Sequence, residues 1–317
     1  MMTRHECAAW FQAHDRFLLL THRRPDGDTL GCAAVLCRGL RQLGKTAYIL
    51  ENPEITEKYR SLHKGLTKTE ADTDDLLISV DVASPNMLSG AFSALCDRIS
   101  LRIDHHVSAQ SFTPLELVDH TAGACAEIIY DVLMEMGVTL DIPMAEALYT
   151  AVSTDTGCFR YANTTAHSLS VAAACAETGA NLFFINQNLF DTNSFAKLRM
   201  QSWIVENLRF YLNGKVALCA LPKQVERDLG VTEDDMENIS GFPRSIEGVC
   251  MAATLRETED GGVKISIRTL PGYNASQVCQ CFGGGGHEGA AGANLNLPLQ
   301  EAAKEVEKAM LSYMASL

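Results

Sequence analysis

The sequence lacks the features of a membrane-spanning, disulfide-stabilised or zinc-binding protein. No apolar run approaches the ~20 residues needed to cross a bilayer, and the N-terminus has no apolar signal-peptide segment. The eleven cysteines are odd in number and include no Cys-x-x-Cys pair, and the closest two, Cys279 and Cys281, are poorly spaced for zinc. These absences predict a soluble cytoplasmic protein with reduced thiols.

Basic residues are also scarce, with 26 Lys and Arg against 39 Asp and Glu and a net charge of -13. Tight nonspecific binding of long nucleic acid depends on basic side chains, so we expect no binding to long duplexes. A short oligonucleotide or a mononucleotide needs only a local basic pocket and stays a candidate ligand. The chain of 317 residues is 47% hydrophobic, which suits one large or two medium domains.

The first part of the chain alternates apolar strands with segments of helical periodicity. The expected strands are 17–21, 46–50, 76–80 and 99–103, and the expected helices are 30–43, 124–136 and 143–154. Strands that alternate with helices predict an α/β fold with a doubly wound, mostly parallel sheet.

The remainder predicts a second, smaller α/β domain behind a helical connector at 193–207. Its expected strands are 210–220, 249–255 and 263–269, with a turn at 260–262, and its expected helices are 275–282 and 299–314. We therefore expect a first domain over residues 1–190, a helical linker over 191–209 and a second domain over 210–317.

Acidic and histidine residues follow successive predicted strands of the first domain. His22 follows the first strand, Asp81 the third, and His105 the fourth. Ligands bind at the carboxyl ends of strands in open α/β sheets, so these side chains are expected to meet at one edge. The full set of candidate metal ligands is His22, Asp26, Asp28, Asp81, His105 and Asp155.

This set offers only oxygen and imidazole ligands, which suit Mn²⁺, Mg²⁺ or Co²⁺ better than structural zinc. Two cations bridged by Asp81 could activate a water and hold phosphoryl oxygens, so the pattern indicates phosphoester or phosphoanhydride hydrolysis. His106 could donate a proton to the leaving group. Taken singly, Asp28 could be a helix N-cap and Asp81 a solvated strand end, but the joint pattern favours a metal centre.

A glycine-rich run with one histidine, residues 283–292, marks the second domain. The amides of Gly284, Gly285 and Gly286 could approach a phosphate closely, and His287 could contact a terminal phosphate. Arg268 offers a bidentate phosphate fork. A flexible loop is the alternative interpretation of the glycines. The histidines outside the clusters are expected to be structural or at the surface, and they are His5, His14, His63, His120 and His167.

Together these motifs resemble the DHH phosphoesterase superfamily and its oligoribonuclease branch. The resemblance is carried by His22-x-x-Pro25-Asp26-Gly27-Asp28, Asp81, Asp104-His105-His106, Asp155 with the following 156–161, and the GGGH-x-x-A-A-G run. It implies one manganese on His22, Asp26 and Asp81, and a second on Asp28, Asp81, His105 and Asp155. It also implies that Arg268 binds substrate and that the chain forms a homodimer. Arg160 would add a phosphate or base contact, with a structural salt bridge as the alternative.

Within this superfamily, the chain resembles the group that has these two domains and no further segments, and this resemblance implies a particular activity. By two-metal activation of water, such a protein degrades RNA of about two to five nucleotides to mononucleotides and dephosphorylates adenosine 3′,5′-bisphosphate. One alternative is a soluble phosphodiesterase for linear or cyclic dinucleotides. A second is a non-catalytic nucleotide-binding protein, against which the complete ligand set argues.

Overall fold

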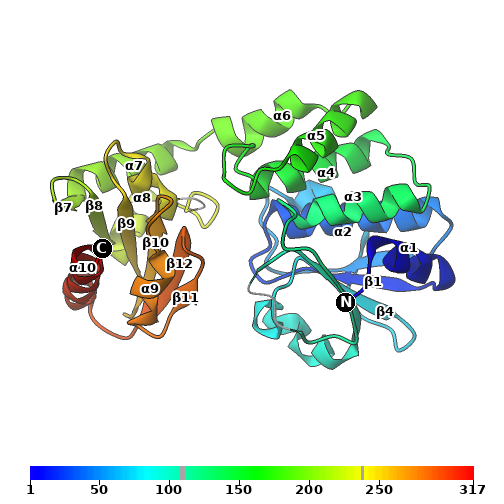
Figure 1. The fold of residues 1–317 in the computed structure, drawn as a ribbon, viewed down its shortest axis with the longest axis horizontal. Helices are drawn as coiled ribbons and strands as arrows, with labels where there is room; N and C mark the ends of the chain where they lie inside the picture. The colour runs from blue at the N-terminus through cyan, green and yellow to red at the C-terminus, as the bar shows by residue number, and fades with distance from the viewer. Residues whose placement is uncertain (108–110, 237–238) are drawn as a thin grey trace. The chain divides into compact units, whose positions relative to one another are not determined.

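The computed structural model describes residues 1–107, 111–236 and 239–317. The chain divides into two compact units, Met1–Thr192 and Asn193–Leu317. Figure 1 shows the elements of each. Within the described residues, no helix combines the length and the apolar character needed to cross a membrane.

The first unit is built on a six-stranded sheet in which every neighbouring pair is parallel. Its order is β3-β2-β1-β4-β5-β6, so the direction of winding changes between the adjacent strands β1 and β4. The strands are β1 Phe17–Leu20, β2 Ala47–Leu50, β3 Thr67–Lys68, β4 Leu76–Val80, β5 Ile99–Asp104 and β6 Leu115–Val118. The expected parallel α/β sheet is confirmed, with the short strands β3 and β6 added to the four predicted ones.

Alternate side chains of this sheet enter two different cores. Leu19 and Ile78 face the larger core, beneath the α-helices, whereas Leu18 and Leu77 face a smaller core beneath residues 85–98. Figure 1 shows α2 and α3 along one side of the sheet. The α-helices are α1 Arg4–Ala13, α2 Gly27–Gln42, α3 Cys125–Glu135, α4 Ile142–Asp155, α5 Ala166–Thr178 and α6 Leu182–Asn186, and the 3-10 helices are η1 Arg60–His63, η2 Pro85–Met87 and η3 Gly90–Arg98.

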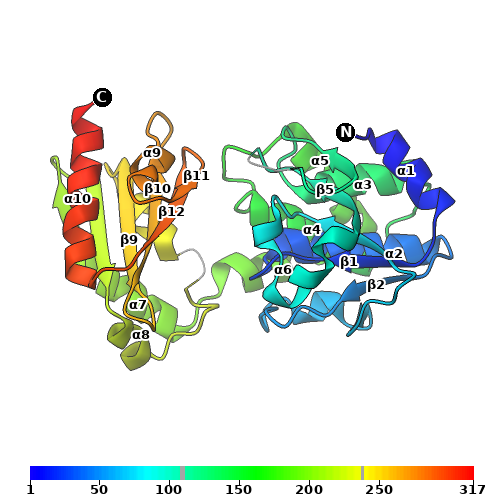
Figure 2. The ribbon, with the colours of Figure 1, turned by 90° about the horizontal axis from the view of Figure 1, so that it is seen from below.

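The second unit has a mixed six-stranded sheet in the order β11-β12-β10-β9-β8-β7, parallel only between β8 and β9 among the pairs described. The strands are β7 Arg209–Tyr211, β8 Val216–Leu221, β9 Met251–Glu257, β10 Val263–Thr269, β11 Gly285–Gly286 and β12 Ala290–Leu295. One face packs on α9 Ala275–Gln280 and α10 Leu299–Ala315, seen in Figure 2. The other packs on α7 Phe195–Asn207 and α8 Lys223–Leu229.

One expected strand of this unit is divided in the structure. The strand expected over 210–220 is broken into β7 and β8 by a turn in which Leu212, Asn213 and Gly214 all have positive φ. The Asn-Gly pair is a strong turn signal and overrides the apolar run around it. The helix α7 lies within the expected linker and packs on this unit, where Met200 and Ile204 are fully buried against β8.

Candidate metal centre and substrate-binding residues

Three neighbouring strands bring the central predicted ligands together. His22 follows β1, Asp81 follows β4, and His105 follows β5. The Nε2 atom of His22 lies 3.7 Å from one carboxylate oxygen of Asp81, and Nε2 of His105 lies 3.6 Å from the other. Asp81 therefore stands between the two imidazoles, at the change of winding between β1 and β4, as a bridging ligand would.

The loop after β1 contributes two carboxylates with different supports. Asp26 is the N-cap of α2 and accepts the backbone N–H groups of Asp28 and Thr29. Its Oδ1 atom lies 3.5 Å from Nε2 of His22. Asp28 instead accepts the N–H groups of Cys125 (2.7 Å) and Ala126 (3.1 Å), where α3 begins. The helix-cap interpretation thus holds for Asp26 in α2, while Asp28 is fixed by another helix.

Asp155 reaches the cluster from the last residue of α4, because α4 packs unusually close to α2. A Cβ atom on Gly31 would lie 2.4 Å from the carbonyl oxygen of Ala147, and one on Gly27 would lie 2.3 Å from Oγ1 of Thr154. This close approach places Oδ2 of Asp155 3.6 Å from Nε2 of His105. The two glycines of α2 therefore have a direct part in forming the cluster.

The candidate ligand atoms form overlapping groups whose members lie within 4.8 Å of one another. Across the described part of the chain these groups are His22-Asp26-Asp81, Asp28-His105-Asp155 and Asp81-His105-His106. The first two match the two predicted metal positions, and Asp81 joins the second through the 3.6 Å approach to His105. The structure thus brings all six predicted ligands together.

Hydrogen bonds orient both imidazoles toward the carboxylates. Nδ1 of His22 donates to the carbonyl of Arg23 (2.8 Å), and Nδ1 of His105 donates to the carbonyl of Ala122 (3.1 Å). A carbonyl only accepts, so the other ring nitrogen, Nε2, is the one that faces the acidic groups. The space between these nitrogens and the carboxylates requires positive charge, either a proton or a metal cation.

Burial of the carboxylates strengthens the need for positive charge between them. Asp81 is 2% exposed, and its Oδ1 has no hydrogen-bond partner within the described residues. Burial, with the charge of Asp28 next, raises the pKa of Asp81 well above its ordinary value. Burial and nearby carboxylates likewise raise the pKa of Asp28 and of Asp155 to about 7. A divalent cation would let all three ionise, so the donor set fits a metal centre.

His106 has a different partner from the other site residues. Its Nδ1 donates to Oδ1 of Asp104 (2.8 Å), which also accepts the backbone N–H of His105. Nη1 of the buried Arg102 lies 3.6 Å from the second oxygen of Asp104. Although burial opposes both charges, the hydrogen bond between them lowers the pKa of Asp104 and raises that of His106. Asp104 thus orients His106 and leaves its Nε2 available.

Asn52 was not predicted from the sequence as a site residue, but its side chain holds the backbone of the His22 loop. Its side-chain amide donates to Oγ1 of Thr21 (3.0 Å) and to the carbonyl of His22 (2.9 Å), and its oxygen accepts the N–H of Glu54 (2.9 Å). Asn52 is buried and comes two residues after β2, which neighbours β1. The strand-end rule that identified Asp81 also applies to this position.

Replacing Asn52 should weaken metal binding without unfolding the protein. In Asn52→Ala the carbonyl of His22 loses its donor, so the His22 loop is held less firmly. We expect about a tenfold higher metal concentration for half-maximal activity, the loss typical of a supporting hydrogen bond. Metal titration of activity measures it, with Asn207→Ala as control, because the Asn207 amide donates to the carbonyl of Trp203 within α7. An unchanged titration would contradict the role.

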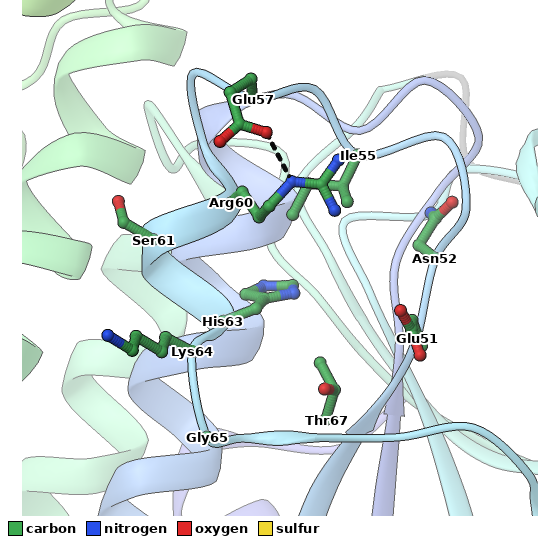
Figure 3. A pocket seen from close by; sticks show the side chains of 10 residues that line it. All are labelled: Glu51, Asn52, Ile55, Glu57, Arg60, Ser61, His63, Lys64, Gly65 and Thr67. Carbon is green, nitrogen blue, oxygen red and sulfur yellow. Dashed lines mark hydrogen bonds and ion pairs between the residues drawn. The ribbon is translucent and has the colours of Figure 1, made fainter.

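A cavity of about 380 Å³ lies between η1 and the segment after β2, and Figure 3 shows its lining. Asn52, which holds the His22 loop, is one of its lining residues, but no predicted site residue lines it. His63 points into it, and its Nε2 donates to the carbonyl of Leu30 in α2 (2.9 Å). Burial lowers the pKa of His63 to about 4, so the ring is neutral and structural, as expected. Glu57 and Arg60 form an ion pair at the rim.

In the second unit, the glycine run forms the β11–β12 hairpin rather than a flexible loop. Gly285 pairs with Gly292, and Gly286, at φ 144°, pairs with Ala291. A Cβ on Gly284 would lie 2.2 Å from the carbonyl oxygen of Gly292. Two of the predicted phosphate-binding glycines therefore have a packing reason to be glycine, in addition to any ligand role.

The two polar residues predicted with this run lie at one end of the sheet. Arg268 in β10 pairs with Ala290 of β12, and the exposed His287 occupies the turn before Ala290. Oγ1 of Thr269 donates to the carbonyl of Glu288 (2.6 Å), which ties this turn to β10. In the first unit, Nε of the exposed Arg160 donates to the carbonyl of Gly157 rather than to a carboxylate. The substrate roles of these residues stay predictions.

Comparison with known proteins identifies the family. Residues 16–152 match the N-terminal domain of the DHH family, and residues 213–316 match the DHHA1 domain. The chain belongs to the DHH phosphoesterase family, a class of hydrolases that act on phosphoester bonds. Over 305 residues it is 33% identical to the bifunctional oligoribonuclease and PAP phosphatase NrnA of Thermus thermophilus, covering 92% of this chain and 88% of that protein.

A further relative and two solved structures extend the comparison. NrnA of Bacillus subtilis is 24% identical, covering 89% of this chain and 90% of that protein. An exopolyphosphatase-related protein of Bacteroides fragilis has the same fold, with a TM-score of 0.87 and 22% identity over 98% of this chain and 96% of the other. RecJ of Thermus thermophilus, solved with Mn²⁺, has a TM-score of 0.59 at 14% identity and covers 99% of this chain, which spans 55% of RecJ.

Proposed function

We propose that this protein is a Mn²⁺-dependent hydrolase that degrades very short oligoribonucleotides to mononucleotides and dephosphorylates adenosine 3′,5′-bisphosphate. The observation that carries the proposal is the convergence of six carboxylate and imidazole side chains, among them the buried Asp81. The substrate class is supported by similarity along most of the chain to proteins named for these two activities. Manganese is supported by the donor set and by RecJ, whose structure was solved with that ion.

In this proposal the first domain, over residues 1–190, is catalytic, the linker covers 191–209, and the domain over 210–317 binds substrate. The first metal would be held by His22, Asp26 and Asp81, and the second by Asp28, Asp81, His105 and Asp155. When bound, the divalent cations activate water and offset negative charge on the phosphoryl oxygens.

The side chains of this chain supply the other steps. His106 is held by Asp104 through Nδ1, so its Nε2 is the atom that would give a proton to the leaving oxygen. Arg268 and His287 would hold a phosphate beside the amides of the glycine run, residues 284–286. Arg160 would add a contact from the first domain. A homodimer, implied by the family, is tested by sedimentation of the purified protein.

The decisive experiment is an assay panel with and without Mn²⁺. The substrates are a labelled RNA dinucleotide, adenosine 3′,5′-bisphosphate, pyrophosphate and a long single-stranded RNA. We expect release of mononucleotides and of phosphate from the first two, with chelator-treated protein as the control. No mononucleotide release from the dinucleotide at any metal concentration would overturn the proposal.

A second candidate is a phosphodiesterase for signalling dinucleotides. The chain is 24% identical over 325 residues to the cyclic-di-AMP phosphodiesterase PdeA of Listeria monocytogenes, covering 94% of this chain but 48% of that protein. Turnover of a linear RNA dinucleotide and of cyclic di-AMP, measured side by side, separates the two candidates. Faster turnover of the cyclic substrate would favour the second. If the protein binds nucleotides tightly but turns over neither substrate, a third candidate, a non-catalytic nucleotide-binding protein, would be indicated.

Arg268→Ala should raise KM for small nucleotides while the metal requirement stays unchanged. The guanidinium is the predicted fork for a substrate phosphate, and loss of a charge-assisted hydrogen bond costs about 1.5–3 kcal/mol, or roughly tenfold or more in KM. Arg209→Ala, an exposed arginine of β7 in the same unit, is the control. Identical kinetics in Arg268→Ala and the wild type would remove Arg268 from the site.

A further inference from the structure

Two arginines occupy the short loop between the first two predicted metal ligands. Arg23 and Arg24 are both exposed, and they lie between His22 and Asp26, whose side-chain atoms approach to 3.5 Å. Building on the proposed function, we propose that Arg23 and Arg24 form a phosphate subsite in the first unit. It would bind a second phosphate of the substrate, next to the phosphate that is cleaved.

The backbone of this dipeptide is fixed on both sides. The N–H of Arg23 donates to the carbonyl of Met87 (2.7 Å), and its own carbonyl accepts from Nδ1 of His22. The N–H of Arg24 donates to the carboxylate of Glu54 (3.1 Å). Three backbone polar groups of the dipeptide are thus held by the surrounding loops, while both residues are exposed. A fixed base reduces the entropy lost when the side chains bind an anion.

The conformation of Arg24 argues that its side chain matters. Its φ is 47°, a region that glycine or asparagine adopts more readily than arginine. The following residue, Pro25, further restricts Arg24 toward extended backbone. A residue kept in a sparsely populated conformation beside a candidate active site points to a functional constraint. A glycine would relieve the strain here, yet the chain carries a guanidinium.

The charge of the centre explains what these guanidiniums would do. The carboxylates of Asp26, Asp28, Asp81 and Asp155 carry four negative charges, and two divalent cations carry four positive ones. The loaded centre therefore has no surplus positive charge for a second phosphate. The chain as a whole has a net charge of -13, which repels a polyanion further. Arg23 and Arg24 follow His22 directly, and successive Cα atoms are about 3.8 Å apart. Their planar guanidinium groups would supply the positive charge for a second phosphate.

The test compares three forms of one RNA dinucleotide, without a terminal phosphate, with a 5′-phosphate and with a 3′-phosphate. The double variant Arg23→Ala/Arg24→Ala should raise KM at least about tenfold for one phosphorylated form, the effect of losing a charge-assisted hydrogen bond. KM for the unphosphorylated form should change by less than about threefold, and the Mn²⁺ dependence should not change. Arg60→Ala, an exposed arginine of η1, is the matched control.

Several outcomes separate this subsite from the broader proposal. If the wild type cleaves none of the three forms, the proposed function is wrong. If the wild type is active and the double variant loses the same factor on all three forms, or needs more Mn²⁺, the subsite is wrong. Arg24→Gly guards against a folding artefact, because glycine accepts the positive φ. We expect it to keep the wild-type melting temperature and still to raise KM for the same phosphorylated form; an unchanged KM would overturn the role of Arg24.

Discussion

Asp81→Asn is expected to abolish turnover while the protein stays folded. Asp81 lies between His22 and His105, and an amide cannot supply the negative charge of the proposed bridging ligand. We expect kcat to fall by at least about a thousandfold, the order seen when an essential group of a catalytic unit is removed. Steady-state hydrolysis of a dinucleotide at saturating Mn²⁺ measures the effect. Asp74→Asn, an exposed acidic residue just before β4, is the control.

In the metal-free protein, the same substitution should leave the melting temperature unchanged or raise it. The pKa of Asp81 is raised because its carboxylate is buried, with the charge of Asp28 next in importance. Removing that carboxylate relieves the repulsion, so the chelator-treated variant should melt at or above the temperature of the wild type. Retained activity in Asp81→Asn would show that the metal assignment is wrong. Lost activity with a lower melting temperature would instead indicate a structural role.

The second large effect that we expect concerns pH: in the metal-free protein, the free energy of unfolding should fall as pH rises. In the metal-free protein the pKa of Asp28 and of Asp155 is about 7, against an ordinary value near 4. Between these values the folded state holds more protons than the unfolded state, so the free energy of unfolding decreases with increasing pH. The stabilising contribution of these groups is complete below about pH 4 and is lost as pH rises through about 7.

Bound Mn²⁺ should reverse this trend, because the cation takes the place of the protons. Its affinity rises as the carboxylates ionise, and a ligand that binds only the folded state raises the melting temperature. Melting curves of chelator-treated and Mn²⁺-loaded protein from pH 4.5 to 7.5 would show a gap that widens with pH. NaCl at matched ionic strength controls for screening. A gap that is independent of pH would mean that metal binding does not displace these protons.

Where a candidate ligand follows a buried apolar strand, the sequence predicts its position in the fold. His22, Asp81 and His105 were placed at one sheet edge because the carboxyl ends of parallel strands must meet there. Asn52 obeys the same rule but was missed, because an uncharged amide after β2 gave no chemical signal. The contacts of Asp28 with α3 depend on how separate helices pack, and no local pattern contains that information.

Errors in the second unit have a different physical origin. The run at 210–220 is apolar enough to suggest one strand, but the Asn213-Gly214 turn adopts positive φ and reverses the chain. The glycines at 284–286 carry almost no apolar signal, so β11 was not expected. Their role as an edge strand is visible only once β12 lies beside them at backbone contact distance.

The spread of the ligands along the chain has a consequence for folding and synthesis. His22 and Asp155 are far apart in the sequence of the first unit, and Asp81 comes between them. During translation the second proposed metal position, which includes Asp155, cannot be complete until α4 has left the ribosome, so a metal bound there cannot guide the early steps of folding. The parallel sheet must form through contacts distant in sequence, which favours slow folding. Binding of this metal would therefore be a late event, and the folded unit would hold protons on its buried acids until then.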